Sequence, residues 1–149
     1  MLILVIGKLT RTEQKLITRI KNIVKERDNC QINSIIIIHN LAQYHKKIEI
    51  ENHINNSLKK SATFNLIEKK IIGIKGYEDR TFFVEESNQG DIKVVHYIMA
   101  KQGTEAGDYY NNLTIKLIKH KYNDCNNRKA IDIPKEIVKL FIRFISRNN

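Results

Sequence analysis

Polar and charged side chains follow three apolar runs of the sequence, and their types could bind an anionic ligand. The runs are 2–6, 35–38 and 92–100, and each reads as a strand. Carboxyl ends of parallel strands meet at one edge of an open α/β sheet, which is where such sheets bind ligands. The side chains expected at this edge are Lys8 and Thr10, then His39 and Asn40, then Lys101 with the turn 102–105.

The turn 102–105 leads into a predicted helix, whose free N–H groups and dipole would favour an anion. Glu105 and Asp108 fall in the first turn of the same helix. Acidic residues there also serve simply to offset the helix dipole. An anion site and ordinary helix capping are both consistent with this pattern.

Histidine, cysteine and serine patterns give no metal site and no nucleophile. His39, directly after an isoleucine run, is expected to be a hydrogen-bonded residue at the end of a strand. The other histidines lack the paired short spacing of zinc sites, and no G-x-S-x-G turn is present. These other histidines are His45, His53, His96 and His120. We therefore predict no catalytic residue and no metal.

One pattern suggests an enzyme. Asp79, with Asp91 and Lys93 on a neighbouring strand, loosely resembles the carboxylate–carboxylate–lysine set of metal-dependent nucleases. Two carboxylates would hold a divalent ion, and the lysine would polarise the attacking water. A set this short also arises by chance.

The elements that would position these residues are helices and strands in alternation. A capping box of Thr10 and Glu13 opens a helix over 10–28, and another helix is expected over 47–60. Segments rich in β-formers follow, the last two of which should pair as an antiparallel hairpin. They are 70–75, 80–85 and 91–100, and a helix over 105–122 comes next. The pattern predicts an α/β fold with a mainly parallel sheet, helices on both faces and an added hairpin.

The C-terminal part is expected to be a polar loop and an amphipathic helix packed on the same domain, within 123–149. Asp132 and Pro134 mark the start of this helix. Basic residues repeat every four positions opposite the apolar face, at Lys135, Lys139, Arg143 and Arg147. Such a face is usually solvated, but it could also lie on a nucleic acid or an anionic membrane.

The net charge of +10 on 149 residues invites a polyanionic partner. Ile, Lys and Asn supply roughly two-fifths of the residues, however, and A/T-rich codons encode all three, so genome composition offers a second explanation. Two distant cysteines build no disulfide framework, and no apolar stretch approaches the ~20 residues of a membrane span. These features are typical of an intracellular, cytoplasmic protein.

The order of the segments 3–6, 10–17 and 35–41, followed by 100–111, resembles the second half of a P-loop GTPase domain. The similarity is greatest to a divergent dynamin- or guanylate-binding-like group of ciliates and other protists, and it covers roughly residues 1–122. It implies a partial P-loop NTPase-like, or Rossmann-like, three-layer domain. It also implies that Asn40, Ala100 and Lys101 are the positions for guanine-nucleotide binding, with GTP or GDP as the ligand.

The sequence departs from that family at its catalytic motifs. The G-x-x-x-x-G-K-[ST] phosphate loop is absent, and the guanine-reading N-K-x-D motif is reduced to Asn40, with Gln43 in place of its aspartate. Since phosphoryl transfer depends on positioned phosphates and Mg²⁺, this chain alone should not hydrolyse GTP. We expect a truncated, GTPase-like interaction module that binds guanine nucleotide weakly at most. Its partner would be another protein or the missing half-domain. The alternative is a small basic protein that binds nucleic acid or an anionic membrane surface.

Overall fold

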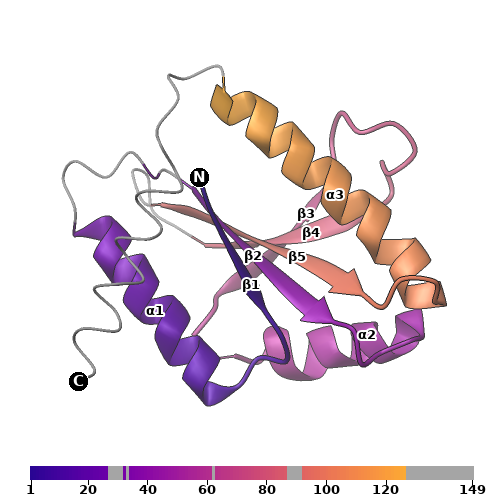
Figure 1. Cartoon of the computed structure of the whole chain (residues 1–149), viewed down its shortest axis with the longest axis horizontal. Coiled ribbons are helices and arrows are strands. Elements are labelled where there is room, and N and C mark those ends of the chain that lie inside the picture. The colour runs from indigo at the N-terminus through magenta and orange to yellow at the C-terminus, as the bar shows by residue number, and fades with distance from the viewer. Residues whose placement is uncertain (27–31, 33, 62, 87–91, 127–149) are drawn as a thin grey trace.

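The computed structural model describes residues 1–26, 32, 34–61, 63–86 and 92–126. They form an α/β fold, a single mixed β-sheet with helices packed against it (Figure 1). The sheet has five strands in the order β1-β2-β5-β4-β3. The strands are β1 (Leu2–Ile6), β2 (Ser34–Leu41), β3 (Leu66–Lys70), β4 (Thr81–Glu85) and β5 (Lys93–Ala100). The helices are α1 (Arg11–Lys25), α2 (Lys47–His53), which continues as a π-helical turn (Ile54–Leu58), and α3 (Glu105–Asn126).

Strands β1, β2 and β5 are parallel, as the three apolar runs predicted. Ile6 of β1 pairs with His39, and Leu41 of β2 pairs with Ala100. Their carboxyl ends therefore share one edge of the sheet.

The sheet is mixed: β1, β2 and β5 are parallel, as expected, and the antiparallel part is larger than the single expected hairpin. β4 pairs antiparallel with β5, which confirms the predicted hairpin, but β3 adds a second antiparallel pairing. The β-rich segment expected over 70–75 lies instead at Leu66–Lys70. Gly73 and Gly76 adopt φ values of 81° and 83°, a conformation that takes the chain out of the extended form. The charged residues of β3 give no apolar alternation, so the sequence pattern did not predict this strand.

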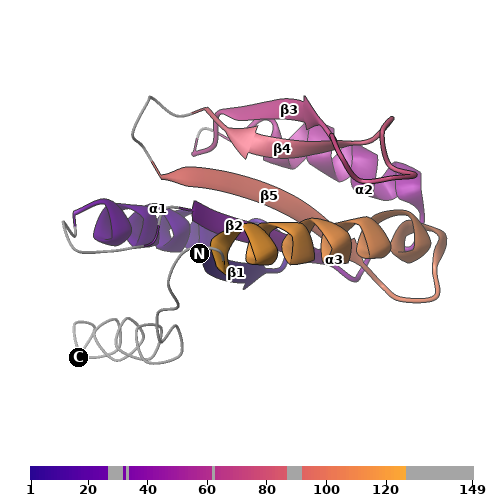
Figure 2. The same ribbon diagram turned by 90° about the horizontal axis from the view of Figure 1, so that it is seen from above.

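The side chains of the central strands alternate between two packed faces. Ile35 and Ile37 of β2 pack with Ile17 of α1, whereas Ile36 and Ile38 pack with Leu113 and Leu117 of α3. The carboxyl end of the first face packs on α2 through Leu41, Ile50 and Ile98. Figure 1 shows α1 and α2 on one side of the sheet and α3 on the other, and Figure 2 shows the order of the strands from above.

The predicted start of α1 is confirmed. Thr10 accepts a hydrogen bond from the N–H of Glu13, and the Glu13 carboxylate accepts one from the N–H of Thr10. The predicted C-terminal helix, with Lys135, Lys139, Arg143 and Arg147, lies outside the described residues. Among the described helices, none is both long and apolar enough to cross a bilayer.

Candidate functional site

The shared carboxyl edge of the sheet brings the predicted nucleotide-binding residues close together along neighbouring strands. Asn40 is exposed and pairs in register with Met99, directly before Ala100. Lys101 is exposed at the start of the loop that leads into α3. Ala100 is buried, and its backbone is already bonded: its N–H donates to Asn111 Oδ1 (2.8 Å) and its C=O accepts from Asn111 Nδ2 (3.0 Å).

The first turn of α3 uses its N–H groups within the chain. The N–H of Ala106 donates to the carbonyl of His45 (3.0 Å), and the N–H of Gly107 donates to the hydroxyl of Thr104 (3.2 Å). The N–H of Asp108 donates to the carbonyl of Thr104. Of the two interpretations of this turn, the geometry favours capping over an anion site, because these donors are occupied.

Residues Asp79 and Lys93 of the nuclease-like set lie at opposite ends of a strand pair. β4 runs antiparallel to β5 with Phe83 opposite His96, so the residues before Thr81 lie near the end of β5, whereas Lys93 begins it. Asp91 lies outside the described residues. Since the set requires the carboxylate and the lysine at one point, the nuclease interpretation was wrong. Among the described residues, no three His, Cys, Asp or Glu side chains lie close enough to hold a metal ion.

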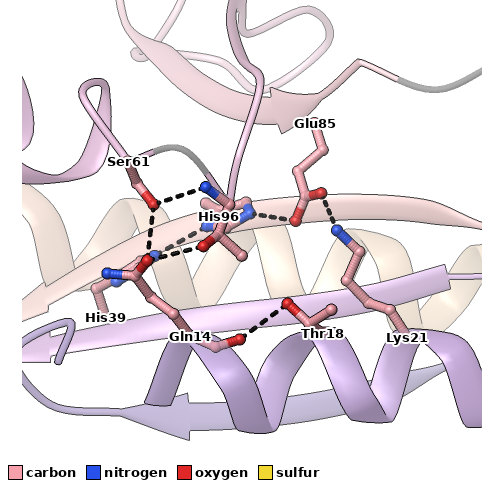
Figure 3. A network of polar contacts seen from close by, with 8 residues as sticks. Gln14, Thr18, Lys21, His39, Ser61, Glu85 and His96 are labelled. Atoms are coloured by element: carbon pink, nitrogen blue, oxygen red, sulfur yellow. Dashed lines mark hydrogen bonds and ion pairs between the residues drawn. The ribbon is translucent and has the colours of Figure 1, made fainter. Parts of the chain in front are cut away.

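A chain of four titratable side chains crosses the interior between α1 and the sheet (Figure 3). Lys21 of α1 pairs with Glu85 Oε2 on β4, and Glu85 Oε1 lies 3.1 Å from Nε2 of His96 on β5. Nδ1 of His96 lies 2.9 Å from Nε2 of His39 on β2. Both rings are fully buried, and Phe64 packs edge-on against His96. Each of the four elements contributes one group, so the chain connects α1 with three strands.

Burial and hydrogen bonding set the charge of each group in this chain. Burial lowers the pKa of His96 below its usual 6.5, more than its hydrogen bond to Glu85 raises it. Burial, with the neighbouring His96, lowers the pKa of His39 well below the same value. For Glu85, burial alone would raise the pKa, but hydrogen bonds from His96 and Lys21 outweigh it and bring the pKa below 4.5. At neutral pH these four side chains are therefore a Lys⁺–Glu⁻ pair followed by two neutral imidazoles.

Two buried ring nitrogens, one at the end of this series and one on α2, have no hydrogen-bond partner among the described residues. They are Nδ1 of His39 and Nε2 of His53. The other ring nitrogen of His53, Nδ1, lies 3.5 Å from the hydroxyl of Tyr44. Buried polar atoms are normally satisfied, so these two atoms are positions that suit an ordered water molecule.

Sequence reasoning predicted His39 as a hydrogen-bonded residue at a strand end, which the contact with His96 confirms. It missed the partners Lys21, Glu85 and His96. The alternation of strand side chains would have placed Glu85 and His96 on one face only if the register of β4 on β5 had been known.

No family model, characterised protein or solved structure was found that matches this chain. The function must therefore be argued from the geometry of the chain itself.

Proposed function

We propose that this chain is a GTPase-like α/β module without a phosphate loop, and that it acts as a non-catalytic interaction module. Its parallel strands β1, β2 and β5 with α1 and α2 on one face and α3 on the other support a partial P-loop NTPase-like or Rossmann-like arrangement. The sequence provides no glycine-rich loop to hold phosphates and Mg²⁺, so it supplies no means of phosphoryl transfer. The bonded backbone of Ala100 is consistent with guanine-nucleotide binding that is weak at most.

The observation that supports the interaction role is the edge position and exposure of strand β1. This strand pairs only with β2, and no described residue pairs with its other edge. Its α3-side residues Ile3 and Val5 are 38% and 64% exposed, because α3 packs on the more distant β5. Parallel strands normally lie inside a sheet with both faces covered. An open, apolar parallel edge therefore suits a strand supplied by a partner polypeptide.

The other edge of the same sheet provides a contrast. β3 carries Glu68, Lys69 and Lys70, all exposed, along its five residues. Charged side chains of this kind protect an edge strand against pairing with another chain. β1, with the sequence Leu-Ile-Leu-Val-Ile, has no such protection. The difference supports β1, and not β3, as the edge that pairs.

Calorimetry tests the nucleotide part of the proposal. Titration with GTP and GDP in the presence of Mg²⁺ should give a Kd no tighter than about 1 mM. Any heat of binding should disappear in Asn40→Ala, and no phosphate should be released. Micromolar binding with turnover would overturn the non-catalytic assignment.

Photo-crosslinking tests the edge. A photoreactive residue at Val5, in the chain expressed in its own cells, should give one defined product that is lost when Ile3→Lys adds a charge to the strand. The same residue at Ile67, 39% exposed on β3, is the matched control. Equal crosslinking from both positions would rule out a specific edge.

A further inference from the structure

An open groove of about 410 Å³ runs along the solvent face of α1, beside the loop that precedes β3. It is lined by the cations Arg11, Lys15 and Arg19 and by hydrogen-bonding side chains that include Gln14, Thr18 and Thr63. No acidic and no large apolar side chain is among its lining residues.

The three cations repeat every four residues on one helix. Residues four apart lie on the same helical face, one above the other, about 6 Å apart along the axis. Like charges at this spacing repel one another, which costs a few tenths of a kcal/mol per pair. Glu13, the acidic residue of the same turn as Arg11, is bonded to the N–H of Thr10. Arg11 and Lys15 therefore give this part of α1 a positive edge that a bound anion would stabilise.

Hydrogen bonds to neighbouring hydroxyls orient the side-chain amide of Gln14 in the groove. Its Oε1 accepts from the hydroxyls of Thr63 (2.7 Å) and Ser61 (3.3 Å). Figure 3 shows the hydrogen bond between the side chains of Gln14 and Ser61. Gln14 lines the same groove as Arg11 and Lys15, and amide and cationic side chains both donate hydrogen bonds to phosphate oxygens.

We propose that the α1 groove binds the phosphodiester backbone of a nucleic acid, without sequence preference. This site is distinct from the β1 edge and goes beyond the interaction role proposed above. Amphipathic helices that lie on an anionic membrane place apolar side chains in the lipid beside their cations. The exposed large apolar side chains, such as Val5, Ile48 and Ile67, do not line the groove. No aromatic side chain lines it either, so base stacking contributes nothing and phosphate contacts dominate.

Fluorescence anisotropy with a labelled, mixed-sequence single-stranded oligonucleotide tests the proposal on the full chain. The variant Arg11→Gln/Lys15→Gln removes two groove cations. The matched control Lys69→Gln/Lys70→Gln removes two exposed cations from β3 and gives the same net charge. The groove variant should weaken binding by about tenfold or more, and the slope of log K against log salt concentration should fall by about 1.5. The control should change the Kd less than about twofold.

Three outcomes would overturn the proposal. The first is a control variant that weakens binding as much as the groove variant, because the charge would then act without a site. The second is no salt-dependent binding of the oligonucleotide by the unmodified chain. The third is binding to phosphatidylserine vesicles that the groove variant abolishes while oligonucleotide binding stays unchanged. Far-ultraviolet circular dichroism of both variants checks that each has kept the fold, so a loss of binding cannot come from unfolding.

Discussion

The side chains of Glu85, His96 and His39 form hydrogen bonds in which each acceptor determines the tautomer of the next ring. Both imidazoles are neutral at neutral pH, because burial lowers the pKa of each, and a neutral imidazole has one N–H. The Glu85 carboxylate accepts the proton of His96 Nε2, so Nδ1 of His96 must accept from Nε2 of His39. His39 Nδ1 is therefore a buried hydrogen-bond acceptor to which no described residue donates.

Replacement of Glu85 by glutamine should destabilise the protein. The change keeps the shape of the side chain but leaves the ammonium group of Lys21 without its counter-charge, and the Lys21 side chain is 27% exposed. Loss of one partner of a fully buried pair costs about 3–5 kcal/mol. Since water reaches Lys21, we expect a smaller decrease of about 1–3 kcal/mol in the free energy of unfolding, measured by urea denaturation.

The adjacent Glu86→Gln is the control for this experiment, because Glu86 is exposed on the same segment. Its effect should stay within about 0.5 kcal/mol. Equal losses from the two substitutions would show that general charge, and not the buried chain, is responsible.

At the scale of the element, local patterns predicted more than non-local ones. The capping box of Thr10 and Glu13 involves residues three apart, so the sequence alone was enough to place the start of α1. The strand β3 could not be placed in this way, because its exposed Glu68, Lys69 and Lys70 give no apolar alternation. The pairing of β3 with β4 decides its conformation, and pairing is a tertiary effect. The edge that Asn40 and Lys101 share was also predicted from local patterns, because short continuous apolar runs are typical of parallel strands.

Position 107, in the first turn of α3, requires glycine because a loop approaches it closely. A Cβ atom at this position would overlap the carbonyl group of Lys101, which is backbone and cannot simply rotate away. Glycine to alanine within a helix normally stabilises by about 0.5–1 kcal/mol. Here Gly107→Ala should instead destabilise by about 1–3 kcal/mol, as overpacking does, and should lower the thermal midpoint.

The same substitution provides a test of the carboxyl edge. Gly76→Ala, at a positive φ of 83° in the loop before β4, is the comparison. It should also destabilise, through backbone strain of about 1–2 kcal/mol, but it should leave the amide NMR resonances of Lys101 and Asn40 unchanged. Gly107→Ala should shift both. Unshifted resonances in Gly107→Ala would mean that the loop does not rest on α3 as described.

For the whole molecule, buried histidines connect stability to pH. The unfolded chain binds protons on His39 and His96 near the usual pKa of 6.5, whereas the folded chain resists protonation because both values are lowered. As pH falls below about 6.5, the unfolded state gains protons that the folded state lacks, so stability decreases. The lowered pKa of Glu85 adds a further loss once the pH falls through about 4.5.

The slope of the free energy of unfolding against pH depends on how many buried histidines contribute. Below about pH 6.5, each can reduce the free energy of unfolding by at most about 1.4 kcal/mol per pH unit, so two together give at most about 2.7 kcal/mol per unit. His53, whose pKa burial also lowers, adds to that slope. Urea denaturation of His39→Gln should remove about one histidine's share, whereas His45→Gln, at an exposed position, should leave the slope unchanged. An equal slope in His39→Gln and the unmodified chain would mean that His39 is protonated in the folded state, and the tautomer order derived for the buried chain would then be wrong.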